Sequence, residues 1–373
     1  MIRVLRHICL LLAFSFSIGK VCGQEDMRLL AGVDFSTYFD NFEYTGTTLG
    51  ESGTNFSARF SPKVGVEWSG RNSLIIGTDL FTNFGDESKF ISKARPLVYY
   101  RYAAPCVKAY AGIFDRKEMV GYYSELFLSD EARFYKNRVQ GIMGQYLGQR
   151  GYAELSIDWC GMYSKEARER FRILSAGRYN FLKNSLFYAG YALQVFHFAG
   201  SELISGSVVD NIIVNPYIGT QFKAFFDFDI KLHGIVTMQR DRAVEDHAQM
   251  PGGALLQLRM SKWGVYIEEQ VYAGRNLMPY YYSAPNGAFP QGYGPELYYG
   301  STLFGTRPYW TTDMIKPNYF FDTRIGYANK FFDDTVAVKA FFALQCDGAK
   351  WGTRQMVELS VNLFKGFLLE KNR

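Results

Sequence analysis

Apolar and polar residues alternate with a period of two along most of the chain. Between residues 54 and 68, one face carries Phe56, Ala58, Phe60, Pro62, Val64, Val66 and Trp68, and the other carries Asn55, Ser57, Arg59, Ser61, Lys63, Gly65 and Glu67. The same alternation recurs near residues 152–159, 226–233 and 357–363. It predicts strands with one face in apolar surroundings and the other in water.

Sixteen segments follow this pattern, and many of them are long. They are 30–39, 54–68, 73–84, 93–103, 106–115, 135–147, 151–161, 170–179, 184–198, 209–222, 224–237, 252–260, 263–273, 317–328, 333–345 and 354–365. A tilted strand needs about 9 to 11 residues to cross the hydrocarbon of a membrane, whereas strands of soluble proteins commonly have about 5 to 6. Aromatic pairs such as Tyr99 and Tyr100 crowd the segment ends, as interfacial girdles do. Long and short connections alternate along the chain. The long ones are 40–53, 116–134, 199–208, 238–251 and 274–316.

The predicted fold class is therefore all-β, a transmembrane antiparallel up-and-down β-barrel. A sheet in lipid has to close, because an open edge would leave backbone groups unpaired. We expect about 16 strands, within a range of about 14 to 18. The range arises because residues 295–304 resemble a further strand inside the long connection.

The first residues read as a signal peptide. Arg3 and Arg6 precede an apolar run from residue 8 to residue 18, and small residues close it, so cleavage would leave Gln24 first. Residues 1–23 are then the signal peptide, and residues 24–373 form a single outer-membrane barrel domain with a long outer loop at 274–316. A loop of this length is either functional or a cap over the barrel. The expected location is the cell outer membrane, after export through the periplasm.

Composition excludes several other classes. Aromatic residues make up 17% of the chain, charged residues 21%, and the formal net charge is +5. A disordered chain, a coiled coil or a basic nucleic-acid binder would have fewer aromatics or more charge, so no nucleic-acid partner is expected. Cys106, Cys160 and Cys346 are too few and too widely spaced for a disulfide framework or a zinc site. We expect no metal and no cofactor.

These features resemble the porin-like outer-membrane β-barrels of Gram-negative bacteria. The resemblance covers residues 24–373 and rests on architecture, with no specific motif. Such barrels often end on an aromatic residue, whereas here Phe364 and Phe367 are followed by further residues up to Arg373. The resemblance implies the lipid bilayer and lipopolysaccharide as surroundings.

A barrel of about 16 strands leaves an aqueous lumen. The candidates for lining it are charged residues of the polar face: Arg59, Lys63, Arg101, Lys108, Asp158, Arg172, Asp227, Asp229, Lys231, Arg259, Glu268, Arg324, Lys339 and Glu358. Opposite charges across a constriction would order water and screen solutes, although each residue is equally well explained as a solvated, ion-paired one. We predict a porin-like channel for passive or weakly selective diffusion of small hydrophilic solutes, without enzymatic activity.

Two alternatives stay open. The barrel would anchor loops that bind or assemble at the surface, or it would be an outer-membrane lipid hydrolase. For hydrolysis, His197 and Ser201, with Glu202 to orient the histidine, form the best pairing. No GxSxG or other catalytic motif supports it, so no catalytic residue is predicted. The sequence indicates neither the solute nor the oligomeric state.

Overall fold

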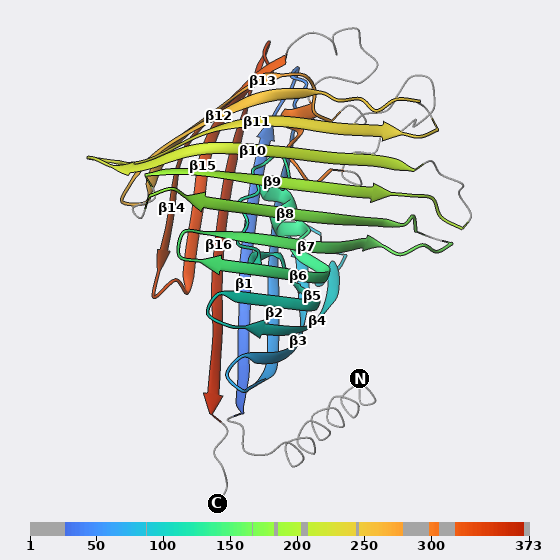
Figure 1. The fold of residues 1–373 in the computed structure, drawn as a ribbon, viewed down its shortest axis with the longest axis vertical. Helices are drawn as coiled ribbons and strands as arrows, with labels where there is room; N and C mark the ends of the chain where they lie inside the picture. Colours follow the sequence, from blue (N-terminus) through green and yellow to red (C-terminus); the bar gives the residue numbers. More distant parts are fainter. Residues whose placement is uncertain are drawn as a thin grey trace, which may run out of the picture.

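The computed structural model describes residues 27–86, 88–165, 167–182, 186–202, 208–243, 246–278, 298–305 and 318–368. The predicted signal peptide and most of the predicted loop 274–316 lie outside these residues. Within them, sixteen strands form one closed barrel, and each strand runs antiparallel to both neighbours (Figure 1). The ring closes where β1 pairs with β16. The predicted fold class is confirmed.

The strands agree closely with the alternating segments. They are β1 (Arg28–Glu43), β2 (Gly53–Trp68), β3 (Asn72–Asn83), β4 (Lys93–Ala103), β5 (Val107–Asp115), β6 (Arg138–Gly148), β7 (Gly151–Gly161), β8 (Arg170–Asn180), β9 (Phe187–Phe198), β10 (Val209–Lys223), β11 (Asp227–Asp241), β12 (Gly252–Lys262), β13 (Val265–Gly274), β14 (Asn318–Phe331), β15 (Val336–Cys346) and β16 (Trp351–Leu368). Three short helices complete the described elements: η1 (Arg116–Glu118), α2 (Asp130–Tyr135) and η2 (Thr302–Gly305).

Short connections gather at one end of the barrel, which we call the short-turn end. Ser69 and Gly70 join β2 to β3, and Trp263 and Gly264 join β12 to β13, all with φ between 53° and 87°. Two consecutive residues of positive φ give a turn whose twist matches that of a hairpin. The other end carries the longer connections, and we call it the long-loop end.

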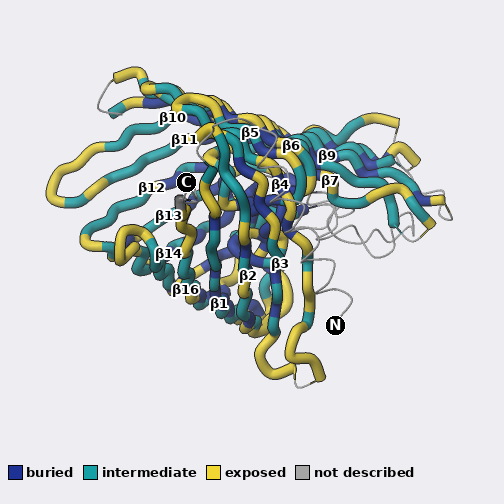
Figure 2. Tube along the Cα trace, turned by 90° about the horizontal axis from the view of Figure 1, so that it is seen from below, coloured by how far each residue is buried: buried dark blue, intermediate teal, exposed yellow. Residues whose placement is uncertain are grey.

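The outward face of the wall is apolar. Ile218, Leu232 and Ile325 have 60%, 50% and 58% of their surface exposed, while polar inward residues such as Asp34 and Gln239 are buried. This is the reverse of a water-soluble protein and suits a lipid-facing wall. Figure 2 shows further exposed stretches at the turns and loop ends. No helix of the described part is long and apolar enough to cross a bilayer.

Residues 116–137 fill part of the lumen, and we call this segment the plug. The Tyr135 hydroxyl is hydrogen-bonded to Ser57 of β2 at 2.8 Å, and the Tyr122 hydroxyl donates to Gln257 of β12. Because β2 and β12 lie far apart around the ring, the plug crosses the interior (Figure 1). The sequence predicted an outer loop over residues 116–134, whereas the structure places this segment inside the barrel. The plug therefore occupies part of the lumen that was predicted to hold water.

The plug is held by a hydrophobic cluster inside the barrel. Leu126, Phe127 and Leu128 pack with inward residues of the wall and with residues 277–278 and 298–304. Gly300 lies so close to the plug that a Cβ atom would stand 2.1 Å from the Leu126 carbonyl oxygen. Only glycine permits this approach. Within 298–305 the chain forms η2 and no strand, so the strand considered at 295–304 is absent from the described part of that range.

Candidate functional site: the plug and the cavities beside it

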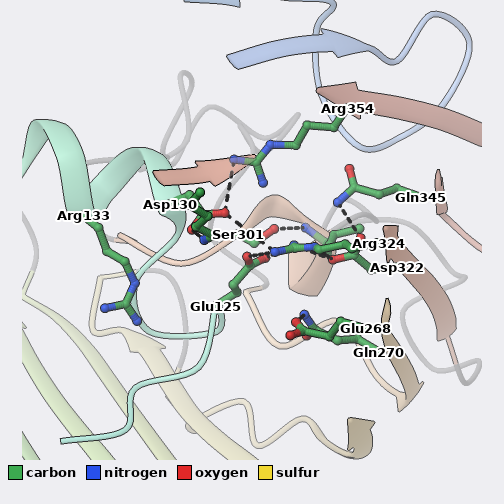
Figure 3. A network of polar contacts seen from close by, with 12 residues as sticks. Glu125, Asp130, Arg133, Glu268, Gln270, Ser301, Asp322, Arg324, Gln345 and Arg354 are labelled. Atoms are coloured by element: carbon green, nitrogen blue, oxygen red, sulfur yellow. Dashed lines mark hydrogen bonds and ion pairs between the residues drawn. The ribbon is translucent and has the colours of Figure 1, made fainter. Parts of the chain in front are cut away.

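One side of the plug carries carboxylates that meet cations of the wall. Glu125 accepts two hydrogen bonds from the Arg324 guanidinium of β14, at 2.6 and 2.7 Å. Arg324 also pairs with Asp322 at 2.5 Å. Figure 3 shows this group of side chains, with Asp130 of α2 and Arg354 of β16 approaching from the other side. A bidentate arginine–carboxylate pair fixes orientation as well as charge.

Asp130 is the second anchoring carboxylate. It begins α2, where Ser129 caps the helix by accepting a hydrogen bond from the Ala132 backbone N–H at 3.1 Å. The Asp130 carboxylate lies 2.7 Å from Lys339 Nζ and 3.6 Å from Arg354 Nη2. Arg354 is shared with Asp40 of β1. The plug is thus tied to β14, β15 and β16 at once.

The two carboxylates respond differently to this environment. Burial opposes ionisation of Asp130, but the cations of Lys339 and Arg354 outweigh it and hold the pKa of Asp130 below its ordinary value. For Glu125, burial exceeds the attraction of Arg324, and its pKa is raised. Asp130 is therefore the firmly ionised anchor.

A cavity of about 150 Å³ lies between α2, the β1 and β16 wall, and residues 298–302. We call it the aromatic cavity. Its lining includes the rings of Phe42, Tyr44, Tyr135, Tyr298 and Tyr299, the hydroxyls of Ser129, Ser301 and Thr302, and the charged groups of Glu131, Lys136 and Arg354. Burial, followed by the nearby Asp40 carboxylate, raises the pKa of Glu131.

A second cavity, of about 360 Å³, adjoins it across Lys136 and Tyr299, which line both. We call it the basic cavity. Its lining contains six basic side chains and a single carboxylate: Lys93, Arg95, Arg116, Lys136, Arg138 and Arg170, with Asp158. The Tyr299 ring lies 3.3 Å from the guanidinium carbon of Arg172. Burial raises the pKa of the Tyr299 phenol to about 12, against the opposing effect of Arg172.

A third cavity, of about 710 Å³, opens at the short-turn end. Its lining mixes charges of both signs, including Lys223, Asp227, Asp229 and Arg259. The aromatic and basic cavities lie at the other, long-loop end, and the plug contributes to the lining of both. The described interior therefore has space at both ends of the barrel.

All fourteen predicted lining residues stand at inward strand positions, but they do not form one group. Three of them bind the plug: Arg324, Lys339 and Asp158. Asp229 pairs with Lys231 at 2.6 Å, and Arg259 pairs with Glu268 at 2.7 Å. The remaining ones are distributed around the wall: Arg59, Lys63, Arg101, Lys108, Arg172, Asp227 and Glu358. Their role as lining of a pore stays a prediction.

Sequence reasoning missed Glu125 and Asp130, because it placed their segment outside the barrel. A signal was present: Leu126, Phe127 and Leu128 form an apolar run directly before the capping residue Ser129. An apolar run in a supposed outer loop indicates burial, and Ser followed by acidic residues indicates a helix start.

The histidines give no support to the pairing considered for hydrolysis. His197 stands on the outward face of β9, stacked on Phe171 with ring centroids 5.0 Å apart. His233, inside the barrel, has its two ring nitrogens hydrogen-bonded to the side-chain amides of Asn215 and Gln257 at 3.2 and 3.0 Å. In the described part, no group of three or more His, Cys, Asp or Glu residues is arranged to hold a metal ion.

Comparison with solved structures finds outer-membrane barrels of Pseudomonas aeruginosa. OpdK has 8% sequence identity over 90% of this chain and 99% of its own, with a TM-score of 0.48. OprD has 10% identity over 91% of this chain and 94% of its own, with a TM-score of 0.49. No curated protein matches the sequence.

A sequence profile of the lipid A 3′-O-deacylase-type family matches residues 23–332. Deacylases are enzymes, so the prediction of a barrel without enzymatic activity is wrong. The sequence contains no GxSxG or other catalytic motif, and the absence of such motifs does not exclude an enzyme. Because the match spans most of the chain, the protein belongs to the lipid A 3′-O-deacylase-type family.

Proposed function

We propose that the protein is an outer-membrane enzyme that removes an ester-linked acyl chain from a phosphorylated glycolipid of the lipid A type. The family match over residues 23–332 carries this proposal. The barrel would hold the enzyme in the outer membrane, with the lipid bilayer and lipopolysaccharide around it and the long-loop end facing outward. The filled interior suits this role, because catalysis on a lipid needs no open lumen.

The aromatic cavity is the proposed reaction site. Its aromatic wall would accept part of an acyl chain, and its hydroxyls and charges lie beside that wall. Glu131 is the proposed general base, since a raised pKa makes a carboxylate a better proton acceptor. Lys136 and Arg354 line the same cavity and would stabilise a developing oxyanion.

In this scheme water attacks the ester carbonyl carbon while Glu131 takes the proton. The bond between the acyl carbon and the sugar oxygen then breaks, and the proton passes to that oxygen. The products are a fatty acid and a free sugar hydroxyl. No covalent intermediate is needed.

Mass spectrometry of lipid A, incubated with the purified barrel in detergent, tests the proposal. The expected product lacks one acyl chain, and Glu131→Gln should lower the rate by about 10² to 10⁴-fold. Glu51→Gln changes an exposed carboxylate at the same end and should leave the rate intact. Unchanged lipid A with a folded wild-type barrel would refute deacylation. Full activity in Glu131→Gln would remove Glu131 from the mechanism.

A second candidate is a channel for small hydrophilic solutes, favoured by the charged inward face and the cavities at both ends. The plug would then have to move for solutes to pass. Single-channel recording in a planar bilayer tests this: wild type should show small or rare steps, and deletion of residues 119–134 should enlarge them. Silence from both proteins, after demonstrated insertion, would exclude the channel. A matching deletion within 279–297 tests whether the long outer loop narrows the passage.

A further inference from the structure

The basic cavity has far more positive than negative charge, and its one carboxylate is already engaged. Asp158 Oδ2 lies 2.5 Å from Arg116 Nη2, and Asp158 Oδ1 accepts the Gln140 backbone N–H at 2.9 Å. Arg138, also on the lining, is bound by Asp79 at 2.6 Å and by Asp115. Arg116 and Arg138 are therefore neutralised by buried carboxylates. Of the other cations of the lining, Lys93, Arg95 and Lys136 form no ion pair with a described carboxylate.

Two of these cations are lysines without an ion pair in the part of the chain that the structure describes. Lys93 begins β4, and Lys136 follows α2, so the wall and the plug each contribute one. Lys136 Nζ lies 5.8 Å from the centre of the Tyr299 ring. Burial, followed by the charge of Lys93 and then of Arg95, lowers the pKa of Lys136. Cations held together in this way repel one another until an anion enters between them.

The cavity also has the right shape for an anion attached to a larger molecule. About 360 Å³ exceeds what one small anion needs, and the aromatic cavity begins on the other side of Lys136 and Tyr299. Guanidinium and ammonium groups that converge from several elements are the usual partners of phosphoryl oxygens. A carboxylate offers fewer oxygens to so many donors.

We propose that the basic cavity is a phosphoryl-binding site, which holds a phosphate group of the substrate headgroup while the acyl ester lies in the aromatic cavity. The identification of the headgroup rests on the proposed function, whereas the binding of a phosphoryl group rests on the cavity alone. Lys93 and Lys136 would supply unpaired positive charge, and Arg95 and Arg170 would complete the site. Binding would also draw the plug and the β4 to β8 wall together, since both contribute cations.

Isothermal titration calorimetry of the full-length barrel in detergent tests the site, with inorganic phosphate and pyrophosphate as probes at constant ionic strength. Wild type should bind both, and pyrophosphate more tightly. Lys93→Glu should weaken binding by about tenfold or more, while Lys93→Arg should retain it. Lys89→Glu is the matched control, because Lys89 is a lysine exposed like Lys93, lies in the β3–β4 connection and does not line the cavity. It should bind phosphate as wild type does.

A wild type that binds neither probe, or equal affinity in Lys93→Glu and Lys89→Glu, would overturn the proposal. The retention of binding by Lys93→Arg shows that any loss in Lys93→Glu is one of charge and not of folding. Deacylation is measured separately, on lipid A with and without its phosphates. Phosphate binding without hydrolysis would leave the site standing and refute the proposed function. If lipid A is hydrolysed at the same rate with and without its phosphates, the site has no role in headgroup recognition.

Discussion

The plug meets the barrel wall on two sides that differ in electrostatic balance. Toward β14, β15 and β16, its carboxylates Glu125 and Asp130 are matched by Arg324, Lys339 and Arg354 at short distances. Toward β4 to β8, Arg116 of the plug pairs with Asp158, the one carboxylate of the basic cavity, whereas Lys93 of the wall and Lys136 of the plug have no carboxylate partner among the described residues. On the first side, the charges of plug and wall balance one another. On the second side, the positive charges are balanced only when an anion binds.

The two sides therefore have different roles: one anchors the plug, and the other is the candidate binding site. A buried ion pair that is fully hydrogen-bonded is costly to break, so the matched side fixes the position of the segment. Charges that are left unbalanced in a folded protein lower its stability, and they commonly mark a site of function.

The largest effect is expected from Arg324→Met on the matched side. The substitution leaves Glu125 and Asp322 buried without their partner, which costs about 3 to 5 kcal/mol. Backbone hydrogen exchange of residues 120–134 should therefore accelerate strongly. Arg178→Met is the control: Arg178 is also inward on β8 but hydrogen-bonds Asn180 and Gln221, away from the plug. Similar exchange in both variants would show that Arg324 does not hold the plug.

Acidification should act on the same side, in two opposite steps. The pKa of Glu125 is raised in the docked plug, so its proton uptake, above its ordinary value of 4.5, favours docking as the pH falls from neutral. The pKa of Asp130 is lowered, so its contribution is present above its ordinary value of 3.8 and is lost as the pH falls further. The protection of the plug against hydrogen exchange, relative to the intrinsic exchange rate at each pH, should rise slightly towards pH 4.5 and fall below 3.8. A loss of protection between pH 7 and 5 would contradict the assignment for Glu125.

Lys339→Gln should destabilise the docked plug less than Arg324→Met or acidification below pH 3.8. Lys339 pairs with Asp130 at 2.7 Å, but 37% of its side chain is exposed, and solvent screens the pair. Asp130 also keeps Arg354 within 3.6 Å. We expect a loss of about 1 kcal/mol in plug docking, measured by the same exchange experiment. A loss as large as that of Arg324→Met would mean that Asp130, and not Glu125, is the principal anchor.

The strands of the barrel wall can be predicted from the sequence, whereas the position of the plug cannot. Each strand is set by alternation within a few residues, and β4 and β7 begin and end where the pattern predicts. The contact between Glu125 and Arg324 joins residues 199 positions apart, and no local pattern encodes such a pair. The basic cavity is assembled from β4, β5, β6, β7, β8, the plug and Tyr299. Arg172 was predicted as a lining residue, but its ring partner Tyr299 belongs to the long loop, so only the folded chain reveals it.

The smallest effect, and the one with the opposite sign, is expected on the unbalanced side. Lys136→Gln removes one of several mutually repelling cations, so in phosphate-free buffer the plug should dock more firmly by about 0.5 kcal/mol. Phosphate should reverse the order, because a ligand stabilises the state that binds it and the variant binds it less well. Hydrogen exchange of residues 120–134, measured with and without phosphate, tests both expectations. A variant that is less stable in both buffers would show that Lys136 holds the plug as Arg324 does, and the two sides would then not differ.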